Sequence, residues 1–211
     1  GLGFETLVYG GLTKVFAGII IAPIGGMVFG MALVGIIIAV FAKRRPAVVN
    51  RTFGRLSIIS SAWLALTHGA NDGQKTMGII VLILFSAGII SEIHMPLWVI
   101  VAAASAMGLG TFFGGYKVIK TLGLKITRLK PYQGFAAQTG GGMMLAIFAV
   151  LGIPASTTHA ITGSVMGAGA ARRKRAVRWK VSRQIIFSWV ITIPGAAGLA
   201  IAFTYIIHLF V

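Results

Sequence analysis

A short polar segment interrupts an apolar part of the sequence. The segment THGANDGQK (67–75) holds a carboxylate, Asp72, an ammonium, Lys75, and the amides of Asn71 and Gln74, with uncharged apolar residues on both sides. Ionisable groups are costly to bury in a membrane, and where they occur they usually bind or move an ion or a substrate. These residue types therefore predict a site for a charged solute.

Asp72 is the one acid expected at membrane depth. The chain has three acids, of which Glu5 lies close to the first residue and Glu92 lies just before Pro96, where a membrane boundary is expected. Two structural alternatives stay open for Asp72. It can pair with Lys75 one turn further along a helix, or it can cap the end of a helix.

A second polar segment follows Pro154 in the stretch 152–175. Proline stops a preceding helix and suits the first position of a new one. Ser156, Thr157 and Thr158 then fall in the first turn, where hydroxyls and unpaired N–H groups can bind an oxyanion. The alternative is that these hydroxyls bond to nearby carbonyl groups and serve packing.

Other chemistry has weaker support in the sequence. His68 and His159 adjoin the two polar segments and could join Asp72 in a metal site, but they show no ligand spacing typical of one. The chain has no cysteine, no phosphate-binding P-loop, no HExxH motif and no triad with a base at hand. We therefore expect neither an enzyme nor a resident metal or other cofactor.

Composition indicates that these segments belong to a membrane protein. Hydrophobic residues make up 57% of the 211 residues and charged residues only 10%, although the formal net charge is +16. Of the 19 basic residues, 17 fall in three clusters, at 43–55, 117–130 and 172–183. Basic clusters between apolar runs are typical of cytoplasmic loops, so nucleic acid is not needed to explain the charge.

The lengths of the uncharged runs suggest how the chain crosses the membrane. Runs 15–42, 93–116 and 184–211 each suit one crossing of about 20 residues, and run 131–171 suits two. The region 56–91 is divided by the first polar segment, which predicts a broken helix near Asn71 and Asp72. We expect an all-α polytopic membrane protein with about six crossing elements, broken or half helices included. With the basic clusters in the cytoplasm, both chain ends lie outside.

Four segments resemble the inorganic phosphate transporter (PiT) family. They are GANDGQKTMG (69–78), YQGFAAQTGG (132–141), GIPASTTHAITGSVMGAGA (152–170) and RRKRAVRW (172–179). The family is built from two inverted repeats that each carry a GAND motif, and this chain has one such motif. The resemblance implies that residues 1–211 form a single transmembrane domain, the C-terminal repeat half of such a transporter.

The resemblance also implies a function and roles for the polar residues. It implies secondary transport of inorganic phosphate with Na+ or H+ by alternating access. The residues expected at phosphate are Asn71, Gln74, Ser156, Thr157 and Thr158. Those expected at the coupling cation are Asp72, Asn71 and Thr157, and secondary candidates are Lys75, Gln138, Thr139 and His159. Gln138 stands where many family members have an acid, which weakens any coupling role there.

The expected partners follow from this function. They are phosphate, a coupling cation, the lipid bilayer and the N-terminal repeat half of the same transporter, with a homodimer as a further possibility. Two alternatives stay open. The same fold could carry sulfate or a divalent metal, or the protein could be a non-transporting receptor or structural subunit for which Asp72 is dispensable.

Overall fold

The computed structural model describes residues 9–208, except for the side chains of 117–119, 122–124, 174 and 208. Most of these residues are helical, which confirms the expected all-α fold with about six long elements. The α-helices are α1 (Tyr9–Val40), α2 (Pro46–Ser86), α3 (Leu97–Lys120), α4 (Pro131–Val150), α5 (Thr157–Ala170) and α6 (Trp179–His208). A π-helical turn, η2 (Thr121–Ile126), precedes α4, and a short 3-10 turn, η3 (Lys174–Ala176), precedes α6.

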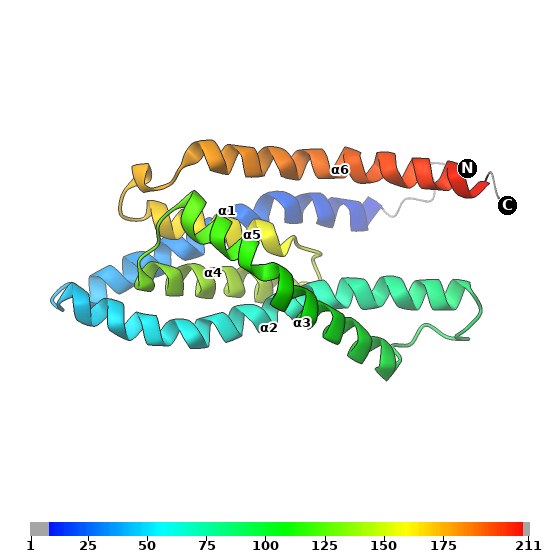
Figure 1. The fold of residues 1–211 in the computed structure, drawn as a ribbon, viewed down its shortest axis with the longest axis horizontal. Coiled ribbons are helices and arrows are strands. Elements are labelled where there is room, and N and C mark those ends of the chain that lie inside the picture. The colour runs from blue at the N-terminus through cyan, green and yellow to red at the C-terminus, as the bar shows by residue number, and fades with distance from the viewer. Residues whose placement is uncertain (1–8, 209–211) are drawn as a thin grey trace.

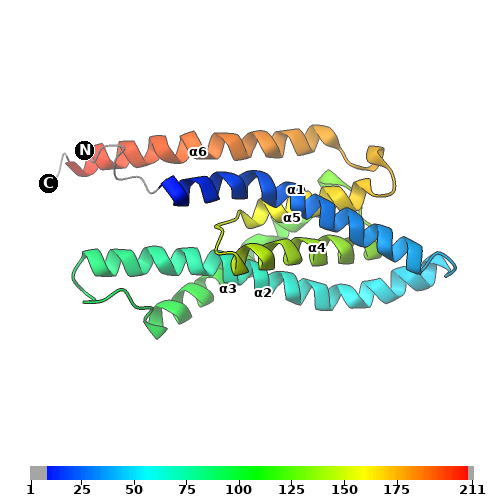
Figure 2. The same cartoon turned by 180° about the vertical axis from the view of Figure 1, so that it is seen from behind.

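The helices run back and forth, and the three basic clusters gather at one end of the bundle. Figures 1 and 2 show the α1–α2 turn, the segment before α4 and the segment before α6 at that end, opposite the α2–α3 connection. A backbone hydrogen bond from Arg178 to Ile126 joins two of these segments. The basic cluster 43–55 was expected to be a loop, but its residues 46–55 already belong to α2.

The prediction of a break near Asn71 is wrong, because α2 is one continuous helix of 41 residues. At about 1.5 Å per residue it is about 62 Å long, roughly twice the thickness of a bilayer's hydrocarbon core. Neither Asn71 nor Asp72 caps a helix. The Asn71 side chain bonds the Thr67 carbonyl within the helix, and Asp72 pairs with side chains one turn away on each side. The polar groups thus satisfy one another and leave the backbone helical.

The second predicted break is present, but it lies partway along the bundle. Helix α4 ends at Val150, residues 151–156 form a turn, and α5 begins at Thr157 and returns toward the basic end. This turn lies beside α2 at Lys75, whose Nζ contacts the Ala155 carbonyl. Helix α2 continues for eleven residues beyond that point, or about 16 Å. The two expected crossings in 131–171 therefore form a hairpin that turns back before it reaches the far end of α2.

Helices α1, α2, α4 and α5 form the packed part of the molecule. The backbones of α1 and α5 approach so closely that glycine is required at their contact. A Cβ at Gly26 would overlap the Ala160 carbonyl oxygen, and one at Gly163 would overlap that of Pro23. Small residues allow such close helix packing in membrane proteins, where dispersion contacts replace the hydrophobic effect.

Helices α3 and α6 lie at the margin of this bundle. Both expose large apolar side chains along their length, such as Phe112 and Phe113 on α3 and Phe187 and Phe203 on α6. Among the described residues, three helices are long and apolar enough to span a membrane: Tyr9–Val40, Leu97–Tyr116 and Trp179–Ile207. The apolar surfaces of α3 and α6 therefore suit contact with lipid or with another protein segment.

Candidate functional site

The structure brings the two polar segments together around the carboxylate of Asp72. The hydroxyl of Thr157, the first residue of α5, donates a hydrogen bond of 2.9 Å to Asp72 Oδ2. This contact connects residues 85 positions apart. The side chain of Asp72 is 30% exposed, and that of Thr157 is buried. The N-terminus of a half-helix and the acid of the long helix thus meet, as the two sequence motifs suggested.

Two basic side chains of α2 complete the surroundings of Asp72. Lys75 Nζ lies 3.1 Å from Oδ1, and His68 Nε2 lies 3.0 Å from Oδ2. The Lys75 ammonium also donates to the carbonyl of Ala155, the residue before the N-cap of α5. The Asp72–Lys75 pair left open as a structural alternative is therefore formed. It does more than stabilise α2, because the same ammonium ties α2 to the turn before α5.

The start of α5 has the geometry of an anion site. Ser156 is its N-cap, and its hydroxyl oxygen accepts a hydrogen bond of 3.4 Å from the His159 backbone N–H. The first N–H groups of any helix lack partners within the helix, and the helix dipole makes that end positive. Asp72 approaches this end through Thr157, and Thr158 is exposed beside it. The hydroxyl and N–H groups at this end can donate to an anionic group, and the Thr157 hydroxyl donates to Asp72 here.

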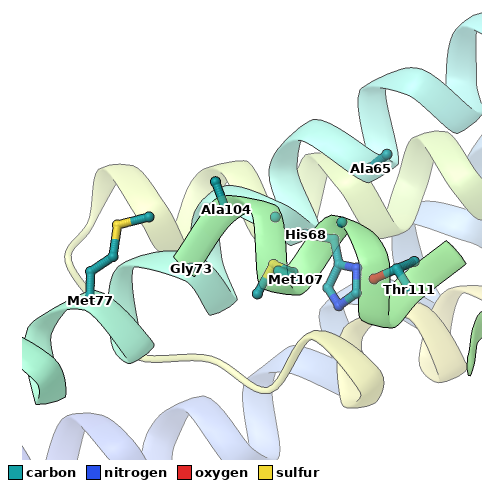
Figure 3. A pocket seen from close by; sticks show the side chains of 9 residues that line it. Ala65, His68, Gly73, Met77, Ala104, Met107 and Thr111 are labelled. Carbon is teal, nitrogen blue, oxygen red and sulfur yellow. The ribbon is translucent and has the colours of Figure 1, made fainter. Parts of the chain in front are cut away.

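A cavity adjoins this cluster between α2 and α3. It has a volume of about 270 Å³, and its lining includes His68, Gly73, Met107 and Thr111. Figure 3 shows the His68 ring between α2 and the part of α3 that carries Met107 and Thr111. Because His68 also contacts Asp72, a solute in this cavity would be separated from the carboxylate by a single side chain.

Two predicted α2 residues do not face the Thr157 hydroxyl. Asn71 is buried, and its amide nitrogen donates to the carbonyls of Thr67 and of Leu145 on α4, at 2.8 and 3.3 Å. Its observed contacts thus connect α2 with α4. Gln74 is exposed, and no hydrogen bond joins it to another residue in the part of the chain that the structure describes.

The secondary candidates on α4 lie in a different part of the bundle. Gln138 accepts a hydrogen bond from the hydroxyl of Ser60 on α2, which is twelve residues, or about 18 Å, from Asp72. The hydroxyl oxygen of Thr139 is buried without a partner among the described residues. Gln138 nevertheless lines a second cavity, of about 570 Å³, whose wall also includes His68. Gln138 and His68 therefore line the same cavity, although no hydrogen bond joins them in the described part of the chain.

His159 has a structural explanation. Pro23 has no backbone N–H and so leaves the Ile19 carbonyl of α1 without its usual helical partner. The His159 ring hydrogen-bonds to the Ile19 backbone and stacks on Trp189 of α6, with ring centroids 3.9 Å apart. His159 thus connects α5 with α1 and α6.

Sequence reasoning did not find several of the contacts at this site. The sequence favours His68 as a hydrogen-bonded packing residue over a metal ligand, but it does not identify Asp72 as the direct partner. In the described part of the chain, no three His, Asp or Glu side chains form a group that could hold a metal. The spacing of His68 and Asp72, four residues apart on one helix face, was the available signal. The role of the Ala155 carbonyl had no sequence signal, since any residue provides a carbonyl.

The sequence matches a known family over most of its length. A sequence model described as the phosphate transporter family fits residues 39–200. A probable low-affinity inorganic phosphate transporter of Rhizobium meliloti (strain 1021) is 47% identical over 196 residues, which cover 92% of this chain and 59% of that protein. A protein of the same name from Bacillus subtilis (strain 168) is 38% identical over 208 residues, covering 98% and 62%. The chain thus spans about three fifths of the length of these relatives.

A solved structure has the same arrangement of helices. It is described as the sodium-dependent phosphate transporter, and it matches with a TM-score of 0.73 over 87% of this chain and 63% of its own. The two sequences are 22% identical, so the likeness concerns the fold.

Proposed function

The chain belongs to the phosphate transporter family, and from this we propose that it forms one repeat half of a secondary transporter that moves inorganic phosphate with Na+ or H+. The names of its relatives support phosphate as the substrate, and the name of the solved structure supports Na+ as the coupling ion. The relatives are transporters and not enzymes, which confirms the prediction that the protein is not an enzyme.

The observation that carries this proposal is the contact between Thr157 and Asp72. A hydroxyl at a helix N-terminus and the adjacent N–H groups are good donors to a phosphate oxygen. In the described structure the hydroxyl donates to Asp72 instead. Phosphate and the carboxylate therefore compete for the same donor, and a cation that neutralises Asp72 would release Thr157 to the phosphate.

This competition would couple the two solutes. A phosphate and a bare carboxylate repel each other strongly in a site of low dielectric constant. A cation between them, or a proton on Asp72, converts that repulsion into attraction, so each solute raises the affinity of the other. Lys75 contributes one positive charge beside Asp72. Inorganic phosphate is a mixture of singly and doubly charged anions at neutral pH, so it needs further compensation from the coupling cation or from a second repeat.

We infer that residues 1–211 act as one transmembrane domain and that a second repeat half completes the site. The exposed apolar side chains of α3 and α6 support this inference, since a partner repeat would cover some of them. The second half would come from the same transporter, or from another copy of this chain in a homodimer. Alternating access would then move one group of helices relative to the other around the site.

A chimera tests the proposed function. In it, this chain replaces the matching 196-residue segment of the Rhizobium meliloti relative, and isotope-labelled phosphate uptake is measured in cells without their own phosphate transporters. We expect uptake driven by a Na+ gradient or a proton gradient, with phosphate competing more strongly than sulfate. Uptake of sulfate or of a free divalent metal at equal or higher rates would instead identify another substrate on this fold.

Asp72→Asn in the chimera tests the role of the carboxylate. Asn keeps the shape and most hydrogen bonds but removes the charge that would hold the cation, so uptake should fall to the background. Glu92→Gln removes an acid from the α2–α3 connection, outside the cluster, and should leave uptake unchanged. Unchanged uptake and ion dependence in Asp72→Asn would favour the receptor or structural alternative.

We also propose that the basic end of the bundle faces the cytoplasm and that the chain ends lie outside. An excess of Lys and Arg marks cytoplasmic segments. Because the chain has no cysteine, single cysteines at exposed Ala47, Arg128 and Ala176 should react with an impermeant thiol reagent from the cytoplasmic side only. A cysteine at Ile93, in the opposite connection, should react from outside only. The reverse labelling would invert the proposed topology.

A further inference from the structure

A small pocket lies at the basic end of the bundle, where all three basic clusters contribute to its wall. Its volume is about 170 Å³, and its lining includes Arg44 from the α1–α2 turn, Lys130 from the residue before α4, and Arg172 from the residues after α5. These three cations come from segments that are far apart in the sequence. The fold therefore concentrates positive charge in one pocket and does not only distribute it over a surface.

No described carboxylate balances these charges. The described acids are Asp72, in the middle of the bundle, and Glu92, in the connection at the opposite end. Every ion pair among residues 9–208 involves Asp72 and its neighbours on α2. Arg44, Lys130 and Arg172 are exposed, so water screens part of their mutual repulsion, but an anion placed among them would still be attracted by all three. The charge distribution thus favours a bound anion.

The remaining wall of the pocket indicates what kind of anion. Asn50 also lines the pocket, and its side-chain oxygen is buried without a hydrogen-bond partner in the described part of the chain, so a ligand hydroxyl would bond to it once the side chain turns toward the pocket. The apolar side chains of Ile37, Ile38, Phe41 and Val49 line the same pocket. Ile38 is 41% exposed, at the end of the long apolar helix α1. A ligand with an anionic group, a hydroxyl and an apolar part matches this wall.

We propose that this pocket binds the headgroup of an anionic phospholipid, with its phosphate among Arg44, Lys130 and Arg172. Basic pockets at the cytoplasmic ends of transmembrane helices suit such headgroups. A phosphoglycerol headgroup provides one negative charge and free hydroxyls within reach of Asn50, and its acyl chains can follow the apolar side chains of α1. A phosphocholine headgroup carries a cation that the three basic residues would repel. The pocket should therefore discriminate between anionic and zwitterionic lipids.

Native mass spectrometry of the purified full chain in detergent tests the proposal. Phosphatidylglycerol and phosphatidylcholine are added at equal concentrations, and the lipid that stays bound is counted. A pocket variant carries Arg44→Gln, Lys130→Gln and Arg172→Gln. A matched control variant carries Lys43→Gln, Arg128→Gln and Arg173→Gln, which remove the same charge from the same three segments without lining the pocket.

We expect the unmodified chain to retain phosphatidylglycerol in preference to phosphatidylcholine. The pocket variant should bind phosphatidylglycerol about a hundredfold more weakly, because each of the three basic residues contributes to binding an anionic lipid, whereas the control should stay within about twofold. Arg44→Lys with Arg172→Lys keeps the charge and should retain binding, and an unfolding temperature of the pocket variant equal to that of the unmodified chain excludes a folding defect.

Three results would overturn the proposal. Equal losses in the pocket and control variants would mean that general surface charge attracts the lipid. Equal retention of phosphatidylcholine would show that the headgroup charge is not recognised. Displacement of phosphatidylglycerol by millimolar inorganic phosphate, with phosphate then bound by the unmodified chain but not by the pocket variant, would identify free phosphate as the ligand.

Discussion

Helix α5 is held in different ways by α1 and by α2. Along its length it lies so close to α1 that a Cβ at Gly163 would overlap the backbone of Pro23. At its first turn it is held to α2 by polar contacts, chiefly that of Thr157 with the partly exposed Asp72. The contact with α1 depends on complementary shape, so α5 cannot move slightly away from α1 without losing the packing between them. The contact with α2 consists of hydrogen bonds that ions or a substrate can replace.

This difference suggests which helices move together in transport. Close packing transmits displacement, so α1 and α5 should behave as one body. The polar contact is where the arrangement can change, because the cation that we propose at Asp72 would alter the partners of Thr157 without disturbing the packed core. We therefore expect that the α1–α5 pair shifts relative to α2 during alternating access.

The largest effect should come from filling the close contact between α1 and α5. Gly26→Leu places a side chain where the backbone of Ala160 lies, and backbone cannot move aside as a flexible side chain can. We expect a loss of more than about 3 kcal/mol, enough to prevent recovery of a folded protein. Thermal unfolding and size-exclusion chromatography in detergent measure this.

Gly35→Leu is the matched control on the same helix, because nothing lies within 4 Å of a Cβ at that position. It adds the same side chain to α1 without touching α5, and its unfolding temperature should stay close to that of the unmodified chain. Equal destabilisation by the two substitutions would mean that the α1–α5 contact is not the rigid part of the molecule.

A smaller effect is expected at the polar contact, and on transport instead of stability. Thr157→Val in the chimera keeps the shape of the side chain but removes the hydroxyl that would donate to phosphate. Loss of a hydrogen bond to a charged group costs about 1.5–3 kcal/mol, so the phosphate concentration for half-maximal uptake should rise roughly ten- to hundredfold. The fold should remain intact.

Thr158→Val compares the two threonines, because Thr158 is also expected at phosphate from the sequence, yet it is exposed and forms no hydrogen bond with Asp72 in the described structure. It should change half-maximal uptake by less than about threefold. If Thr158→Val has the larger effect, phosphate approaches α5 from its exposed side, and the competition between phosphate and Asp72 for Thr157 does not occur.

The sequence predicted the positions of the helices better than the close packing of α1 against α5. Uncharged runs located the helices, and Pro154 marked the start of α5, because proline and charge act locally. The α2 break was predicted wrongly for a physical reason. The end of a charge-free run shows only where the next ionisable residue lies. A helix continues through such residues where their side chains pair with each other, as Asp72 and Lys75 do.

The candidate site was predicted in part. The motifs named Asp72 and Thr157, and the structure brings them together. The motifs could not predict that Asn71 bonds the Leu145 carbonyl of α4, because the rotation of a helix depends on all its packing contacts at once. Contacts between residues about 80 positions apart, such as that of Lys75 with the Ala155 carbonyl, leave no pattern in a single sequence.

The smallest effect should come from the second polar contact of α2, which lies outside the region proposed to change. The hydroxyl of Ser60 donates to Gln138 on α4, about 18 Å along α2 from Asp72. Both groups are neutral, so their coupling in a double-mutant cycle of Ser60→Ala and Gln138→Leu should be about 0.5–1.5 kcal/mol of unfolding free energy. The phosphate concentration for half-maximal uptake should change by less than about twofold, because the bond only joins two packed helices.

The cavity that Gln138 shares with His68 makes this last expectation a sharp one. If solute reaches Asp72 from the α2–α3 side alone, Gln138→Leu leaves uptake unaltered, and α4 serves as scaffold together with α1. If solute instead passes along the shared cavity, an apolar side chain at position 138 would slow uptake as strongly as Thr157→Val. Because the Asp72 cluster would be intact in that variant, the defect would show as a lower maximal rate with unchanged ion dependence. Measured in the chimera, that result would assign α4 to the transport path and move the boundary between the rigid and the changing parts of the molecule.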